Sequence, residues 1–254
     1  MITGFIFDVD GVLVNSPHER AWGDTLRELM ENRWTDLIQT TGYDPQLYTS
    51  EVYQAHVAGK PRAQGAAALL AYFGIDDPDG ARRELLCDKK QDMIERLIED
   101  GEFEAFDDAL RFLLEAKAAH GLLAAASSSR NANQLMSRVD LSAFCVSRGL
   151  KYDFLASGAT LLDVFDANVC GREFARGKPH PEIFLCAAQM LGVRPEESVV
   201  IEDAPSGVQA AKAGGMACVG VARNNDHDLL KDAGADWVVT SLDEIEPSAI
   251  AASG

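Results

Sequence analysis

The chain has 254 residues, of which 47% are hydrophobic, so it is long enough to bury one large core or a core and a smaller domain. Lys and Arg number 23 against 40 Asp and Glu, which sets the formal net charge at −17. This charge argues against nucleic acid and membrane surfaces as partners, because both bind clustered positive charge. No apolar run approaches the roughly 18 residues of a membrane helix, and Asp8 and Asp10 interrupt the first apolar stretch, which argues against a signal peptide.

The cysteines are odd in number, at five, and none forms a C-x-x-C pair, so a zinc ribbon or a disulfide framework is not expected. Free thiols are typical of a reducing compartment. We therefore expect a cytoplasmic protein, as a monomer or a weak homodimer.

Short apolar runs alternate with helical patterns in most of the chain. The runs are residues 4–8, 121–126, 198–201, 217–221 and 236–240, and helical spacing is clear in residues 109–119 and 181–191. Strands that are apolar on both faces and alternate with helices are typical of a parallel α/β sheet. The small residues of the tail, 248–254, are expected to fray.

The segment from about residue 17 to 103 breaks this rhythm and contains no convincing strand. Helical patterns cover residues 19–31, 46–57, 62–73 and 81–99. Ser16 and Glu19 have the spacing of a capping box that would start the first of these helices. The segment therefore predicts an all-helical domain inserted after the first strand.

Two acids, Asp8 and Asp10, end the first strand and are followed by Gly11. Alternate residues of an extended chain point the same way, so both carboxylates should face one pocket. Such crowding is costly unless a cation or a reaction requires it. Taken alone, the pair could also be loop acids that cap the next element.

Three further motifs follow or precede elements of the predicted sheet. Ser127, Ser128 and Asn131 come after the second strand, where hydroxyls and amides before a helix make a phosphate cradle. Lys178 precedes a helix, and Glu202 with Asp203 ends another strand, where hard oxygen ligands suit Mg²⁺. Alone, these motifs could be an N-cap cluster, a surface lysine and solvated acids.

All these motifs lie where ligands bind in an open α/β sheet, beyond the carboxyl ends of the strands. Their order resembles the haloacid dehalogenase-like (HAD) superfamily, and specifically its β-phosphoglucomutase-like branch. The resemblance spans nearly the whole chain. It implies a Rossmann-like parallel-sheet core formed by residues 1–15 and 104–254, with a small helical cap formed by residues 16–103.

The resemblance also implies a role for each motif. Asp8 would be the nucleophile that forms an aspartyl-phosphate, and Asp10 the general acid and base. Ser127 would hold the transferring phosphoryl group, and Lys178 would steady its charge. The Mg²⁺ ligands would be Asp8, the Asp10 carbonyl, Glu202 and Asp203. Members of the superfamily that cleave carbon–halogen bonds generally lack an acid at the position of Asp10, so the resemblance favours phosphate chemistry.

The cap resembles the β-phosphoglucomutase branch at His18, Arg62 and Lys90, which the resemblance makes substrate-binding residues together with Ser128 and Asn131. Without the resemblance, all three cap residues could be solvated charges. Two features depart from the branch: the hinge reads Asn15-Ser16, and the stretch before Lys178 is long. Residues 144–172 of that stretch could reshape the pocket mouth, bind a partner or extend a loop.

The sequence thus predicts a Mg²⁺-dependent phosphatase acting on a small phosphorylated metabolite, such as a sugar phosphate. One alternative is a β-phosphoglucomutase-type phosphomutase. A lower-ranked alternative is a protein that binds a phosphometabolite without turnover.

Overall fold

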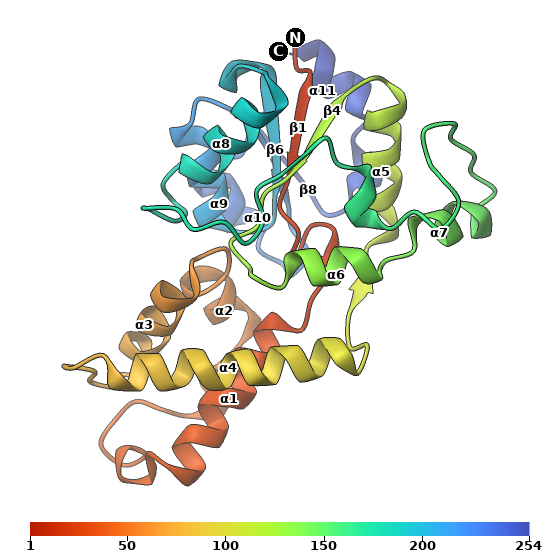
Figure 1. The fold of residues 1–254 in the computed structure, drawn as a ribbon. Helices are drawn as coiled ribbons and strands as arrows, with labels where there is room; N and C mark the ends of the chain where they lie inside the picture. The colour runs from red at the N-terminus through yellow and green to blue at the C-terminus, as the bar shows by residue number, and fades with distance from the viewer. Residues whose placement is uncertain (254) are drawn as a thin grey trace.

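The computed structural model describes residues 1–253 and has a parallel six-stranded sheet at its centre (Figure 1), with strand order β5-β4-β1-β6-β7-β8. The strands are β1 (Gly4–Phe7), β4 (Leu122–Ala125), β5 (Ala167–Asn168), β6 (Ser198–Glu202), β7 (Ala217–Val221) and β8 (Trp237–Val239). The strand β1 lies between β4 and β6, with Phe7 opposite Ala125 on one side and Ile201 on the other. The predicted α/β class and the five predicted strands are confirmed.

Side-chain alternation along the strands divides the apolar core between the two faces of the sheet. In β1, Phe5 and Phe7 belong to one buried cluster, whereas Ile6 belongs to the other. The first cluster includes Phe112 of α5, and the second includes Phe184 of α8. Helices therefore cover both faces, which a parallel sheet requires.

The core helices lie on the two sides of the sheet in Figure 1, with α5 and α11 on one side and α8 and α9 on the other. They are α5 (Asp107–Ala118), α6 (Ala132–Arg138), α7 (Leu141–Ser147), α8 (Glu182–Leu191), α9 (Pro205–Ala213), α10 (His227–Asp232) and α11 (Pro247–Ser253). The helical patterns at 109–119 and 181–191 are confirmed as α5 and α8. The tail was expected to fray, and this is wrong for its described part, because Ile250 of α11 is buried in the first core cluster. Gly254 lies outside the described residues.

Four helices between β2 (Val14–Asn15) and β3 (Glu104–Ala105) form a separate block below the core in Figure 1. They are α1 (His18–Asn32), α2 (Ser50–His56), α3 (Arg62–Tyr72) and α4 (Ala81–Glu99). They share an apolar cluster of their own, which includes Trp22, Leu69 and Leu86. The pattern predicted for residues 46–57 is shorter than expected, because a 3₁₀ turn at Pro45–Leu47 precedes α2. We call these four helices the cap.

The two linkers of the cap pair as an antiparallel ribbon, with Val14 opposite Ala105. The predicted capping box at the start of α1 is wrong, because the helix has no side-chain cap. The Ser16 hydroxyl instead bonds Asp10, and the Glu19 carboxylate accepts a hydrogen bond from the Ser50 hydroxyl.

Residues 144–172 include the end of α7, a 3₁₀ turn at Leu161–Val164 and the edge strand β5. The helix α7 lies beside α5, on the side of the core away from α3 (Figure 1). Leu161 and Val164 are buried in the first core cluster, so this stretch is partly structural. No helix within residues 1–253 is both long enough and apolar enough to cross a membrane.

Candidate active site

The predicted motifs converge at the carboxyl edge of the central strands. Asp8 and Asp10 follow β1, Ser127 follows β4, and Glu202 ends β6. Because β1 lies between the other two strands, their ends are neighbours. The structure brings Lys178, from the loop before α8, against the same edge.

Lys178 is fully buried and holds two of the carboxylates. Its Nζ lies 2.6 Å from Asp8 Oδ1 and 3.2 Å from Glu202 Oε2. Burial alone would lower the pKa of Lys178, but the charges of Asp8 and Glu202 outweigh it and raise the pKa. The lysine is therefore charged at neutral pH, and a surface position is ruled out.

Asp8, Glu202 and Asp203 form a buried acid cluster, with one carboxylate oxygen of each lying within 4.8 Å of the others. Burial, reinforced by the Asp8 charge, raises the pKa of Asp203 to about 8. Burial also raises the pKa of Asp8 and of Glu202, despite the nearby Lys178. This donor set fits Mg²⁺, because hard oxygen ligands are crowded here beyond what one lysine neutralises.

Two glycines make room for the acid cluster. A Cβ at Gly11 would overlap the Asp203 carboxylate, and one at Gly207 would overlap Glu202. Gly11 also has a φ of +85°, which L side chains rarely adopt. Gly11 is thus required both by its backbone conformation and by the close approach of the Asp203 carboxylate.

Asp10 faces hydrogen-bond donors rather than the lysine. The Ser127 hydroxyl donates to Asp10 Oδ2 at 3.0 Å, and His18 Nε2 lies 3.3 Å from Oδ1. Burial would raise the pKa of Asp10, but the His18 interaction and the hydroxyls of Ser16 and Ser127 lower it to about 2. Asp10 is therefore ionised in the ligand-free protein.

His18 connects Asp10 to the cap. Its Nδ1 lies 2.8 Å from Lys90 Nζ, and its Nε2 lies 2.9 Å from the Ser129 hydroxyl. His18 is 8% exposed and Lys90 is 4% exposed, so neither is the solvated charge that the sequence alone allowed. Burial, with the Arg62 charge adding to it, lowers the pKa of Lys90 to about 7.

Arg62 lies at the start of α3 and faces the core through Gln91. Its guanidinium donates to the side-chain amide oxygen of Gln91, Oε1, and Gln91 Nε2 donates to Asn131 Oδ1 at 3.0 Å. The Ser128 hydroxyl is bonded to the cap backbone, at the Gly59 carbonyl (3.3 Å). The five predicted substrate-binding residues therefore all lie where the cap meets the core.

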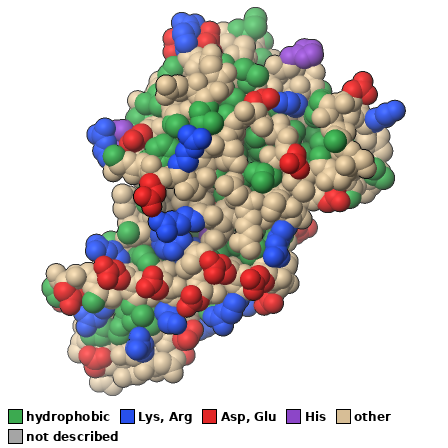
Figure 2. Space-filling view, in the orientation of Figure 1, with side chains coloured by type: hydrophobic (Ala, Val, Ile, Leu, Met, Phe, Trp, Pro, Cys, Tyr) green, Lys and Arg blue, Asp and Glu red, His purple; other side chains and the backbone are tan. Residues whose placement is uncertain are grey.

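Positive charge gathers at this junction although the chain as a whole is acidic. Figure 2 shows a group of Lys and Arg side chains where the cap meets the core. Burial lowers the pKa of Arg62, and the nearby Arg130 adds to that effect. Such a cationic boundary suits an anionic ligand.

Sequence reasoning missed several residues of this junction. Ser129 had a signal in the run of serines after β4, since hydroxyls there predicted a phosphate cradle. Gln54 and Gln91 had none, because their contacts to Asp203 and Asn131 join residues remote in sequence.

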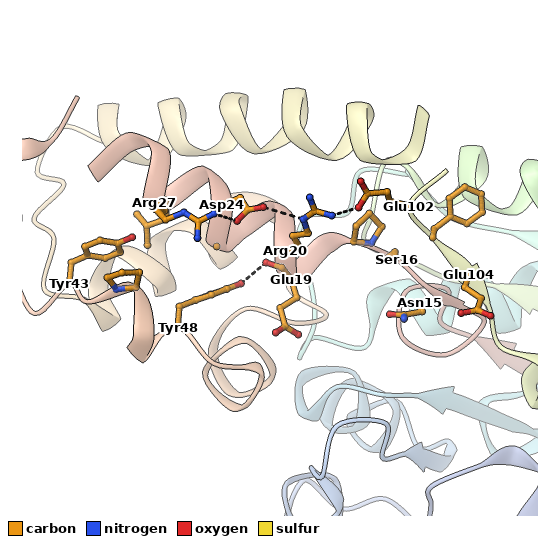
Figure 3. Close-up of a pocket in the computed structure, with 15 residues that line it drawn as sticks. Asn15, Ser16, Glu19, Arg20, Asp24, Arg27, Tyr43, Tyr48, Glu102 and Glu104 are labelled. Atoms are coloured by element: carbon orange, nitrogen blue, oxygen red, sulfur yellow. Dashed lines mark hydrogen bonds and ion pairs between the residues drawn. The ribbon is translucent and has the colours of Figure 1, made fainter. Parts of the chain in front are cut away.

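A cavity of about 700 Å³ lies elsewhere, beside the two linkers (Figure 3). Its walls include Asn15, Arg20, Tyr48 and Glu104, and none of the predicted catalytic or substrate-binding residues lines it. Arg20 there bridges Asp24 of α1 and Glu102 of the second linker. We therefore place the chemistry at the strand ends and not in this cavity.

Comparison with known proteins identifies the family of the chain. The family model for haloacid dehalogenase-like hydrolases matches residues 2–215. The β-phosphoglucomutase of Mycobacterium tuberculosis is 34% identical over 94% of this chain and 90% of its own. A phosphorylated carbohydrates phosphatase of Thermotoga maritima is 29% identical over 91% and 90% of the two chains.

A solved structure shows the same fold. The archaeal β-phosphoglucomutase from Pyrococcus superimposes with a TM-score of 0.68 at 28% identity, over 98% of this chain and 97% of that one. The chain therefore belongs to the haloacid dehalogenase-like hydrolases and is an enzyme of their β-phosphoglucomutase-like branch.

Proposed function

We propose that this enzyme transfers a phosphoryl group through an aspartyl-phosphate on Asp8 and hydrolyses a small phosphorylated sugar with the help of Mg²⁺. The observation that carries the proposal is the buried contact of Lys178 with Asp8, inside an acid cluster and next to a separately held Asp10. Phosphoryl transfer needs little beyond in-line positioning and stabilisation of oxygen charge.

Asp8 acts as the nucleophile. Its Oδ1 is fixed by Lys178 at 2.6 Å, so the other oxygen, Oδ2, is available for attack on phosphorus. A carboxylate nucleophile divides one difficult displacement into two easier ones. The Ser127 hydroxyl and the Lys178 ammonium stabilise charge on the phosphoryl oxygens.

Asp10 exchanges the protons. In its ionised state it is a base for the water that cleaves the aspartyl-phosphate. A phosphoryl anion bound beside Asp10 raises its pKa, because like charges disfavour ionisation. That shift allows Asp10 to take up a proton and deliver it to the leaving oxygen of the sugar.

Asp8, Glu202 and Asp203, with the main-chain carbonyl of Asp10, would hold the cation. Bound there, Mg²⁺ would offset the repulsion between the Asp8 carboxylate and an anionic substrate.

The cap supplies substrate contacts. Arg62 and Asn131 would bind the sugar phosphate at the junction, with His18, Ser128 and Lys90 around them. Two relatives act on substrates of this chemical class, since one is named as a β-phosphoglucomutase and another as a phosphatase of phosphorylated carbohydrates. We place the domain boundaries at 15/16 and 103/104, so that the β2–β3 ribbon is the hinge of the cap.

The phosphomutase reaction is the second candidate. Arg62 and the nearby Arg130 provide positive charge at the junction, where a second phosphate of a sugar bisphosphate would bind. The relatives named β-phosphoglucomutase also favour it. Binding without turnover has no such support, because the set of predicted catalytic side chains is complete.

One assay separates the two reactions. The pure protein is incubated with Mg²⁺, β-glucose 1-phosphate and a trace of glucose 1,6-bisphosphate, and both glucose 6-phosphate and free phosphate are followed. Free phosphate is the result expected for a phosphatase, whereas glucose 6-phosphate without free phosphate identifies a mutase. If neither free phosphate nor glucose 6-phosphate forms, and no product forms from any of a panel of phosphorylated sugars, the sugar-phosphate assignment is contradicted.

A further inference from the structure

Gln54 of the cap reaches the acid cluster of the core. It lies on α2, is 4% exposed, and its Nε2 is 3.5 Å from Asp203 Oδ2. Its other amide atom, the carbonyl oxygen Oε1, is buried and has no hydrogen-bond partner among the described residues.

A buried carbonyl without a hydrogen-bond partner destabilises the folded protein. A leucine at this position would avoid that cost, so the amide points to a donor that binds here. When the cation is bound, Asp203 is ionised and can only accept hydrogen bonds, so it does not satisfy Oε1 in that state. A water molecule held by a cation does, because metal binding polarises its O–H groups.

We propose that Gln54 Oε1 accepts a hydrogen bond from a water ligand of the cation held by Asp8, Glu202 and Asp203. Gln54 thereby links closure of the cap to occupancy of the metal site. This inference rests on the metal assignment of the proposed function and extends it to a residue of the cap.

Two other contacts that hold the cap against the core differ in kind from that of Gln54. The Ser206 hydroxyl donates to the Ala58 carbonyl at 3.0 Å, and the Ser128 hydroxyl donates to the Gly59 carbonyl. These bonds join core side chains to the cap backbone and involve no carboxylate of the cluster. Gln54 instead carries a cap side chain to Asp203, so its contribution depends on the cation.

The linkage is reciprocal. If the closed cap strengthens cation binding by some factor, the cation favours the closed cap by the same factor. Mg²⁺ should therefore compact the protein, and loss of the Gln54 amide should weaken both effects together.

The test is a Mg²⁺ titration by calorimetry, with small-angle X-ray scattering before and after addition of the metal. The variants are Gln54→Leu, which removes the amide at similar size, and Gln64→Leu, which makes the same change at an exposed position of α3. We expect Gln54→Leu to bind Mg²⁺ about tenfold more weakly and to lose the Mg²⁺-induced compaction. Gln64→Leu should behave as the parent protein does.

Gln54→Met is the second variant, because it removes the carbonyl acceptor from an unbranched side chain of similar length and adds no charge, and it should also lose the compaction even if Gln54→Leu folds poorly. The inference is overturned if either variant is folded and binds Mg²⁺ within twofold of the parent with equal compaction. A parent protein that binds no Mg²⁺ overturns the metal assignment together with this inference. A parent protein that binds Mg²⁺ and compacts, but releases no phosphate and isomerises no sugar phosphate, contradicts the proposed reaction and leaves the role of Gln54 standing.

Discussion

Lys178 Nζ lies 2.6 Å from Asp8 Oδ1, and the side chains of the two residues are 0% and 6% exposed. This contact joins the end of β1 to the loop before α8, which are 170 residues apart in the sequence. A buried pair of this kind is strongly destabilising to break, because the remaining charge has no partner. Lys178 also contacts Glu202, so the same lysine neutralises two carboxylates at the strand ends.

The acid cluster predicts that the metal-free protein loses stability between pH 5 and pH 7. The pKa of Asp203 is raised from 3.8 to about 8, so the folded state keeps a proton that the unfolded state releases above about pH 4. The free energy of unfolding therefore falls as the pH rises through this window, by roughly 2–3 kcal/mol between pH 5 and 7 for one proton. Urea denaturation in EDTA at pH 5 and at pH 7 measures this change in the free energy of unfolding.

Asp203→Asn removes this titration and should flatten the pH dependence, whereas Asp153→Asn, at an exposed position, should leave it unchanged. Mg²⁺ competes with the proton and should therefore stabilise the parent protein more at pH 7 than at pH 5. Equal stabilisation by Mg²⁺ at both pH values would contradict this account of the cluster.

We predict that replacement of Arg62 selectively weakens the affinity for phosphorylated sugars. Loss of a charge-assisted hydrogen bond costs about 1.5–3 kcal/mol, so Arg62→Met should raise KM for the sugar phosphate by roughly 10- to 150-fold. Turnover of p-nitrophenyl phosphate, which offers no sugar to the cap, should change little. Arg33→Met, at an exposed position of the cap, is the control. Equal losses on both substrates would place Arg62 in the phosphoryl-transfer step instead.

We predict that closure of the cap over the core requires a glycine at position 177. A Cβ at this position would overlap Pro61, which precedes Arg62. Gly177→Ala should therefore keep the cap from seating and reduce kcat/KM for the sugar phosphate by about tenfold or more. Gly42→Ala, where the new Cβ would lie 3.6 Å from its nearest neighbour, should be close to neutral. Steady-state kinetics measures kcat/KM for both variants, and an equal loss in Gly177→Ala and Gly42→Ala would refute the prediction.

The sequence predicted the arrangement of the core site because each acid or lysine is adjacent to a strand or helix with a clear apolar pattern. Asp8, Ser127 and Glu202 lie at the ends of such strands. Neighbouring parallel strands bring their ends together whatever lies between them in the chain. The order of the motifs then pointed to the family that the comparisons show.

The cap junction and the sheet edge were harder to predict. The strand β5 has two residues and no apolar run of its own, so no periodicity marks it. Ser16 and Glu19 have capping-box spacing, but tertiary partners, Asp10 and Ser50, take their side chains. Lys90 stands among other charges, and only the packing of α4 against α1 shows that it is buried beside His18.

The replacement of the proposed nucleophile tests the central claim most directly. Phosphate release from a phosphorylated sugar by Asp8→Asn is compared with that by the parent protein and by Asp153→Asn, with circular dichroism and thermal melting to confirm the fold. The account predicts that Asp8→Asn stays folded, with Lys178 still paired to Glu202, and that its turnover falls by more than about a thousandfold. Undiminished phosphate release by a folded Asp8→Asn would contradict it.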